Sequence, residues 1–157
     1  MAYLWLAILL HFSRRSVVPK VTIKSAKKRA WDWFSKMVRL QECDDQGYCT
    51  CYTCGKRAFW KGGDMQAGHG IGSRRNSILF ERDLVKSQCY RCNVPMGGNY
   101  DIFHAKLIKE YGMDTYDAWV LKKNKESVSW SIAELEEMIA EFKDEAKKIA
   151  LDKGLVI

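Results

Sequence analysis

Two Cys-x2-Cys pairs, separated by 34 residues, stand in the middle of the chain: Cys51, Cys54, Cys89 and Cys92. Such a pair of turns directs four thiolates at one centre, and four thiolates make a closed, structural Zn²⁺ site. Disulfides are the alternative in a secreted chain, but the paired spacing favours a metal and a reducing compartment. Cys49 is an alternative fourth ligand, and Cys43 is interpreted as a small buried apolar residue.

One histidine lies between the two cysteine pairs. His69 comes 15 residues after Cys54 and 20 before Cys89, at the end of the β-prone run 65–69. Imidazole has a pKa near 7, so a histidine beside a water molecule can act as a general base. A single histidine in a strand is also typical of an ordinary structural residue, and only its neighbours in sequence favour the catalytic interpretation.

Basic side chains surround this histidine. Arg74 and Arg75 follow it closely, where a guanidinium can clamp two phosphate oxygens or stabilise a charged transition state. Arg82, Lys86 and Arg91 are expected to extend the same surface. Each is by itself a common solvated charge, but as a group they predict contacts with DNA.

Charge is distributed unevenly along the 157 residues, which carry a net charge of +7. Residues 1–100 hold 17 basic and 7 acidic side chains, whereas residues 101–157 hold 9 and 12. A basic part of this size favours a polyanionic partner, because Lys and Arg that neutralise phosphates release counterions; a solubilising excess of charge is the alternative. A hydrophobic content of 47% argues against disorder, and a mean hydropathy of −0.32 argues against a multispan membrane protein.

The elements that must position these residues are expected to be short strands between amphipathic helices. The β-prone segments 58–60 and 65–71 predict a hairpin, and 83–88 is a further extended stretch. Ser25 is the predicted N-cap of the first helix, which has a basic face, and Ser131 with Glu134 predicts a capping box for the last. Apolar residues at helical spacing predict helices at 25–40, 100–111, 115–122 and 131–153.

We divide the chain into an N-terminal extension (1–24), a zinc-stapled unit with a basic helix (25–112) and a helical C-terminal tail (113–157). The apolar run 3–12 is shorter than the roughly 20 residues of a membrane-spanning helix. Its charges follow the apolar run, which is the wrong order for a signal peptide. We therefore expect an extra packing helix or an upstream start, and no membrane anchor. The helix 131–153 is interpreted as a packing or dimerisation helix.

The motifs stand in a recognisable order: CYTCGK, QAGHGIGSRR, RDLVKSQCYRCN and GGN, followed by a helix. This order resembles the HNH, or His-Me finger, endonucleases, whose ββα-metal unit carries a base on its first strand and a metal ligand on its helix. The runs GYCTCYTCGK, AGH-x3-SRR, QC-x2-CN and KEYG more closely resemble the phage NinG (Rap) recombination family, over about residues 28–112.

The resemblance implies an α+β fold, with a small ββα-metal unit stapled by the four-cysteine zinc site and flanked by amphipathic helices. It implies that His69 is the general base, assisted by Arg74, and that Asn93 binds a catalytic Mg²⁺ or Mn²⁺. Asn99 is the second candidate ligand. Gly68 departs from the HNH pattern, in which an Asp or His often precedes the base, so the metal would have few protein ligands.

The leading hypothesis is an HNH-type endodeoxyribonuclease that hydrolyses DNA phosphodiester bonds. The resemblance implies phage recombination, branched DNA substrates and the cytoplasm of a bacterial host. A two-armed junction would suit a homodimer, with 131–153 as its interface. Two alternatives are a non-catalytic zinc-stapled DNA-binding module, which Gly68 favours, and a sequence-specific HNH homing or restriction nuclease.

Overall fold

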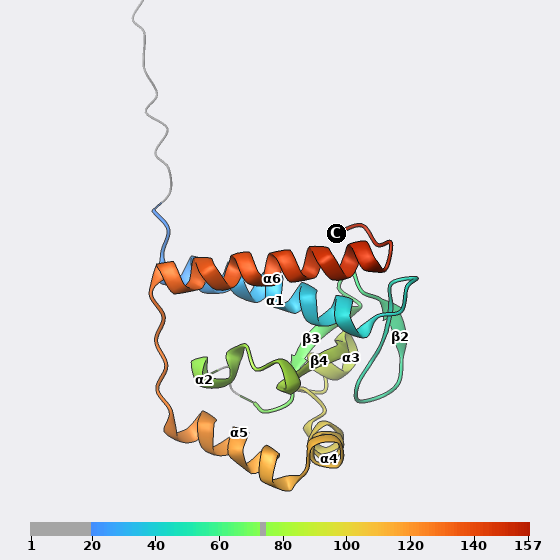
Figure 1. Cartoon of the computed structure of the whole chain (residues 1–157). Helices are drawn as coiled ribbons and strands as arrows, with labels where there is room; N and C mark the ends of the chain where they lie inside the picture. Colours follow the sequence, from blue (N-terminus) through green and yellow to red (C-terminus); the bar gives the residue numbers. More distant parts are fainter. Residues whose placement is uncertain (1–19, 73–74) are drawn as a thin grey trace, which may run out of the picture.

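A computed structural model describes residues 20–72 and 75–157 (Figure 1). Arg74 and most of the N-terminal extension therefore lie outside the described residues. The elements, in order, are α1 (Ile23–Glu42), β1 (Tyr48–Thr50), β2 (Arg57–Phe59), β3 (Met65–His69), α2 (Asn76–Leu79), the 3₁₀ turn η1 (Arg82–Leu84), β4 (Val85–Cys89), α3 (Tyr90–Asn93), α4 (Tyr100–Tyr111), α5 (Met113–Lys125) and α6 (Ile132–Asp152). The predicted α+β class is confirmed.

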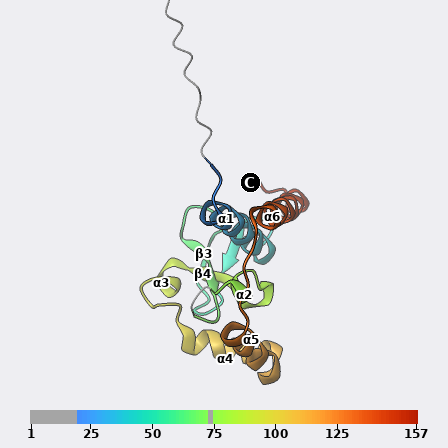
Figure 2. The same cartoon turned by 90° about the vertical axis from the view of Figure 1, so that its left-hand side faces the viewer.

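The elements form three levels. The long helices α1 and α6 lie side by side, the strands lie against them, and α4 and α5 lie on the far side of the strands (Figures 1 and 2). None of the helices in the described residues is long and apolar enough to cross a bilayer. The predicted division at residue 112 stays a prediction, although α6 of the tail packs on α1 of the zinc unit.

Both long helices begin with a capping box. In α6 the Ser131 hydroxyl accepts from the backbone N–H of Glu134, whose carboxylate accepts from the Ser131 N–H, as predicted. In α1 the cap is Thr22, and Ser25 is its reciprocal partner three residues later. The prediction of Ser25 as the cap was therefore wrong, because both hydroxyls take part in the same box.

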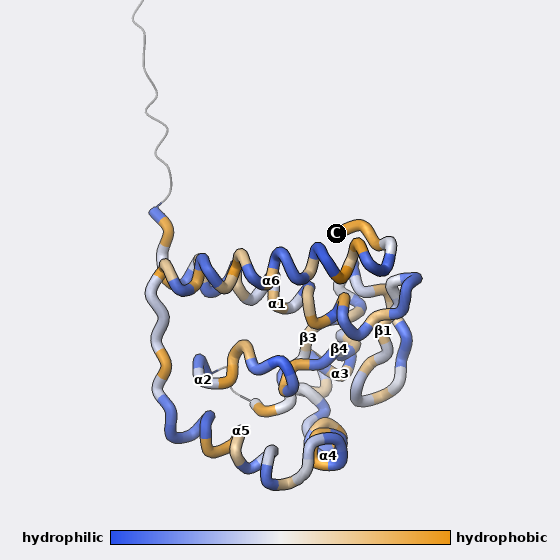
Figure 3. Tube along the Cα trace, in the orientation of Figure 1, coloured by the Kyte–Doolittle hydropathy of each residue, from blue (hydrophilic) through white to orange (hydrophobic). Residues whose placement is uncertain are grey.

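The apolar stripe of α6 is covered by α1 of the same chain. Hydrophobic and hydrophilic residues alternate along α6 (Figure 3), and its apolar side faces the first helix. Phe142 meets Phe34 of α1 with ring centroids 5.1 Å apart. This stripe therefore packs within the chain. The homodimer, with 131–153 as its interface, stays a prediction.

The predicted hairpin between 58–60 and 65–71 is wrong. β2 pairs with β1, whereas β3 pairs with β4 from Met65 opposite Cys89 to His69 opposite Val85, and both pairs are antiparallel. The first cysteine pair lies in the turn that closes β1 and β2, where the Cys51 N–H donates to the Lys56 carbonyl. Because this turn pairs β2 with β1, β2 does not pair with β3. Residues 61–64 connect the first sheet to the second.

Truncation of Phe142 tests the helix pair. We expect Phe142→Ala to lower the free energy of unfolding by about 3–5 kcal/mol, because it empties a site between Phe34 and Phe80. Leu151→Ala, on the same helix at 79% exposure, should change it by less than about 0.5 kcal/mol. Urea denaturation of the zinc-loaded protein measures both values. Equal losses would show that the α1–α6 contact is not a main source of stability.

Candidate functional site

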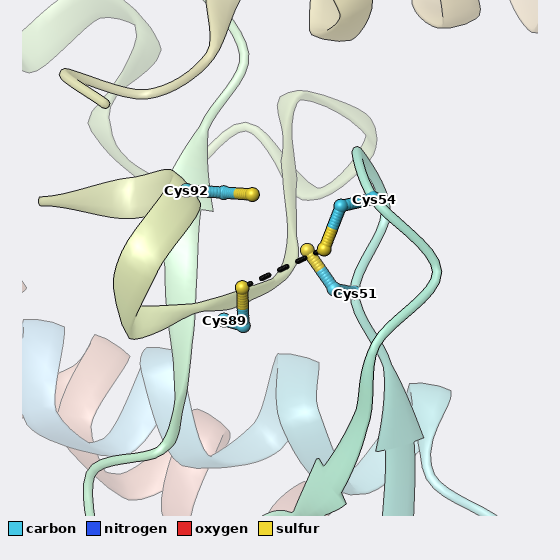
Figure 4. Close-up of side chains that lie close together, drawn as sticks. All are labelled: Cys51, Cys54, Cys89 and Cys92. Carbon is cyan, nitrogen blue, oxygen red and sulfur yellow. Dashed lines mark hydrogen bonds between the residues drawn. The ribbon is translucent and has the colours of Figure 1, made fainter. Parts of the chain in front are cut away.

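The four predicted cysteines converge on one point (Figure 4). Their sulfur atoms all lie within 4.8 Å of one another, and Cys54 Sγ lies 3.7 Å from Cys89 Sγ. Zn–S bonds of about 2.3 Å in a tetrahedron place sulfurs about 3.8 Å apart. Donor type and spacing therefore both fit a structural Zn²⁺ ion, which these four side chains would hold.

The pKa values of the cysteine thiols also fit a site that binds a cation. Burial acts to raise the pKa of the Cys51 thiol, but hydrogen bonds from the backbone of Cys89 and the side chain of Thr53 outweigh it and lower this pKa to about 6. Burial raises the pKa of the Cys89 thiol to about 12. Four thiolates cannot coexist here without a positive charge, so metal binding must release protons.

The remaining two cysteines lie outside this cluster. Cys49 Sγ donates to the carbonyl of Arg39 and Cys43 Sγ to that of Leu40, each at 3.2 Å. Burial raises the pKa of Cys49 to about 12, which keeps it a neutral thiol. Cys43 is buried, in agreement with its interpretation as a small apolar residue.

A buried glutamine connects the loops that hold the cysteines. Gln88 is fully buried, and its Nε2 donates to the Thr53 hydroxyl at 3.2 Å and to the Gly98 carbonyl at 2.6 Å. Thr53 Oγ1 in turn lies 3.4 Å from Cys51 Sγ. Gln88 was not among the residues predicted from the sequence, although a glutamine directly before Cys89 in an apolar strand was a usable signal.

Gln88 also explains Gly68. A Cβ on Gly68 would lie 2.2 Å from Gln88 Oε1 and 3.0 Å from Gln88 Cβ. Any larger residue would displace the amide that joins the cysteine loops. The absence of an Asp or His before His69 therefore has a packing cause in this chain.

His69 ends β3 and is 7% exposed. Its ring stacks on Trp31 of α1, with centroids 4.6 Å apart and planes at 18°. Nε2 lies 3.0 Å from the Leu79 carbonyl. A neutral ring with its proton on Nε2 would donate there, which makes Nδ1 the basic nitrogen.

Asn93 ends α3 and opens into a cavity of about 200 Å³. Its Nδ2 donates to Gln66 Oε1 at 2.7 Å, so its oxygen is the atom suited to a cation. Trp31 lines the same cavity. The indole of Trp31 therefore contacts both His69 and the space in front of Asn93.

Asn99 lies beside the cysteine cluster and not among the residues that line the cavity of Asn93. It precedes α4 in the left-handed conformation (φ 49°, ψ 49°), which asparagine tolerates better than most residues. Its Nδ2 lies 3.9 Å from Cys92 Sγ, a long contact to a thiolate sulfur. Asn99 therefore lies beside the cysteine cluster, and its part as a ligand of the catalytic metal stays a prediction.

The model of one protein family, described as Bacteriophage Lambda NinG protein, matches residues 14–153. The chain belongs to the NinG family. The match extends the resemblance in both directions, to include all of α1, α5 and α6. Comparisons with curated proteins and with solved structures gave no significant match.

Two of the basic residues proposed for DNA contact are accessible in this NinG family member. Arg75 is exposed at the start of α2, and Arg91 is exposed on α3 beside the second cysteine pair. Arg74, the proposed catalytic arginine, lies outside the described residues.

Two others have partners within the chain. The guanidinium of Arg82 binds Glu145 and Glu141 of α6, which raises the pKa of Arg82. Lys86 is 9% exposed, and its ammonium donates to Tyr111 at 2.7 Å and to Glu110 at 3.3 Å. Both hold helices against the strands, a role that the sequence analysis did not anticipate.

Metal analysis of single variants tests the cysteine cluster. We expect about one Zn²⁺ per chain in the wild type and almost none in Cys89→Ser, since three thiolates leave the tetrahedron open. Cys49→Ser is the matched control and should keep its zinc. Removal of zinc by a strong chelator should abolish the cooperative melting seen by circular dichroism. Zinc loss in Cys49→Ser but not in Cys89→Ser would contradict the assignment.

Proposed function

We propose that this chain is a metal-dependent endonuclease that cleaves DNA phosphodiester bonds, of the HNH type. The observation that carries the proposal is the order β3–β4–α3, with His69 on the first strand and Asn93 on the helix. The strands pair antiparallel, and the zinc cluster anchors the junction of β4 with α3. A base and an oxygen ligand on such a unit are the minimum that phosphodiester hydrolysis requires.

In this mechanism His69 acts through Nδ1. The Leu79 carbonyl would hold the proton of Nε2 and fix the ring, while Nδ1 would take a proton from the attacking water. Nδ1 is buried in this structure, so water would have to reach it when DNA binds. A Mg²⁺ or Mn²⁺ ion held by the Asn93 oxygen would supply charge stabilisation for the phosphate. Among the described residues, the acids form no cluster around Asn93. Water and the phosphate itself would therefore complete the coordination of the metal ion.

DNA is the proposed substrate because cations surround Trp31. Lys24, Lys27 and Lys28 line a cavity of about 270 Å³ together with Trp31. Arg75 and Arg91 add exposed charge on α2 and α3. We carry over branched recombination intermediates, and action in the bacterial host cytoplasm, from the NinG family resemblance.

A non-catalytic DNA-binding module is the second candidate. It is favoured by the small exposure of His69, whose ring is stacked under Trp31. In that case Trp31 and His69 would form only a structural contact. DNA would bind without Mg²⁺ and remain intact.

A nicking assay on branched and linear DNA separates these functions. With Mg²⁺ or Mn²⁺, we expect the wild type to cleave branched DNA and His69→Ala to lose about 10²–10⁴-fold in rate, the usual contribution of a general base. His104→Gln is the matched control. That histidine stacks between Tyr100 and Tyr116 on α4 and α5, away from β3, and its rate should match the wild type.

The result that would reject the nuclease is cleavage that does not depend on His69. DNA binding in EDTA with no cleavage of any substrate would favour the binding module. Mapped cuts that follow sequence rather than branch position would favour a homing or restriction nuclease.

A further inference from the structure

Arg39 is a half-buried cation held only by neutral groups. It lies on α1, one turn after Ser35, and its Nε donates to the Ser35 carbonyl at 3.0 Å. Nη1 donates to the carbonyls of Trp60 and Met65. These bonds fix the guanidinium against the start of β3 without neutralising its charge.

Among the described residues, no carboxylate neutralises the Arg39 guanidinium. None of the ion pairs among the described residues includes Arg39. Residues 1–19 and 73–74, which lie outside the described ranges, contain no Asp or Glu. Burial lowers the pKa of Arg39, with only the Cys49 thiol acting in the opposite direction. A partly desolvated cation without a counter-charge is costly to a fold. Three other arginines do pair with carboxylates: Arg29, Arg57 and Arg82.

Arg39 lines the same cavity as Asn93. This space of about 200 Å³ is lined by Arg39, Ser35, Gln66 and Asn93, with Trp31 as one wall. At about 30 Å³ per water molecule, the cavity has room for an anion and part of its hydration shell. The lining supplies a planar cation, the Ser35 hydroxyl and the amide nitrogen of Gln66, which together suit the oxygens of a tetrahedral anion.

We propose that this cavity is a phosphate-binding site, in which Arg39 and Ser35 bind a backbone phosphate of the nucleic acid. That the ligand is a nucleic-acid phosphate rests on the proposed function. That the cavity binds an anion follows from the Arg39 charge, which has no carboxylate partner among the described residues. Trp31 lines this cavity and also stacks on His69, so the bound phosphate would lie close to the base and to the cation that Asn93 would hold. Arg39 would then position the strand for His69.

Two variants of Ser35, to Asp and to Asn, have side chains of the same shape and test the site without removing Arg39. In Ser35→Asp the new carboxylate is one turn from Arg39, where it can pair with the guanidinium and take the place of the anion. Ser35→Asn has the same shape and no charge. Calorimetric titration of the zinc-loaded full chain with inorganic phosphate, without Mg²⁺, should show binding at least about tenfold weaker for Ser35→Asp, as expected for a lost charged hydrogen bond. Ser35→Asn, which loses the hydroxyl but adds no charge, should be weakened clearly less than Ser35→Asp.

Two arginine variants complete the experiment. Arg39→Gln should lose phosphate binding, whereas Arg57→Gln, which removes the same charge from an exposed pair on β2, should keep it. Equal phosphate affinity in Ser35→Asp and Ser35→Asn, or no phosphate binding by the wild type beyond that of chloride at equal ionic strength, would overturn the proposal. This assay contains no DNA and no catalytic metal. Failure here with His69-dependent cleavage intact rejects only the phosphate site, and the reverse outcome rejects only the nuclease.

Discussion

The convergence of four thiolates on one centre is the constraint on which the rest of the fold depends. It joins the turn between β1 and β2 to the end of β4. Because β4 is thereby fixed at Cys89, its partner β3 is fixed in register as far as His69. Gln88 extends the constraint inward, since its amide joins the two cysteine loops and leaves space only for glycine at position 68. The metal site and the candidate catalytic histidine are thus two ends of the same strand pair.

The second organising element is α1. It covers β3 and supplies Trp31, which stacks on His69, and Arg39, which fixes the start of β3. Both side chains come from a helix that ends directly before Cys43, more than 20 residues before β3. α6 holds this helix in place through Phe142 and Phe34. The long helices therefore belong to the architecture of the candidate site, although they lie outside the ββα unit itself.

Much of this could be predicted from local sequence patterns. The zinc ligands follow from spacing, and the helices 100–111 and 131–153 follow from apolar periodicity and caps, because these depend on residues close in sequence. Strand pairing failed, because three-residue strands carry almost no pattern and their partners are chosen by the cysteine turn. The stacking of Trp31 on His69 and the unpaired charge of Arg39 could not be predicted, since each depends on how a distant helix crosses β3. Gln88 was visible in the sequence, but its importance depends on a contact with Gly98 that only the fold creates.

The basic excess of the first hundred residues predicts a polyanion surface, yet its members divide into three groups in the structure. Arg82 and Lys86 are paired with acids of α6 and α4, so they stabilise the fold rather than a ligand. Lysines on α1 and the arginines of α2 and α3 remain at the surface, where each contributes mainly screened, long-range attraction. Arg39 is partly buried and has no carboxylate partner among the described residues, and a charge in that setting interacts with an anion more strongly than an exposed one. The net charge of a basic chain therefore says little about where its anion binds; the burial and pairing of single cations decide it.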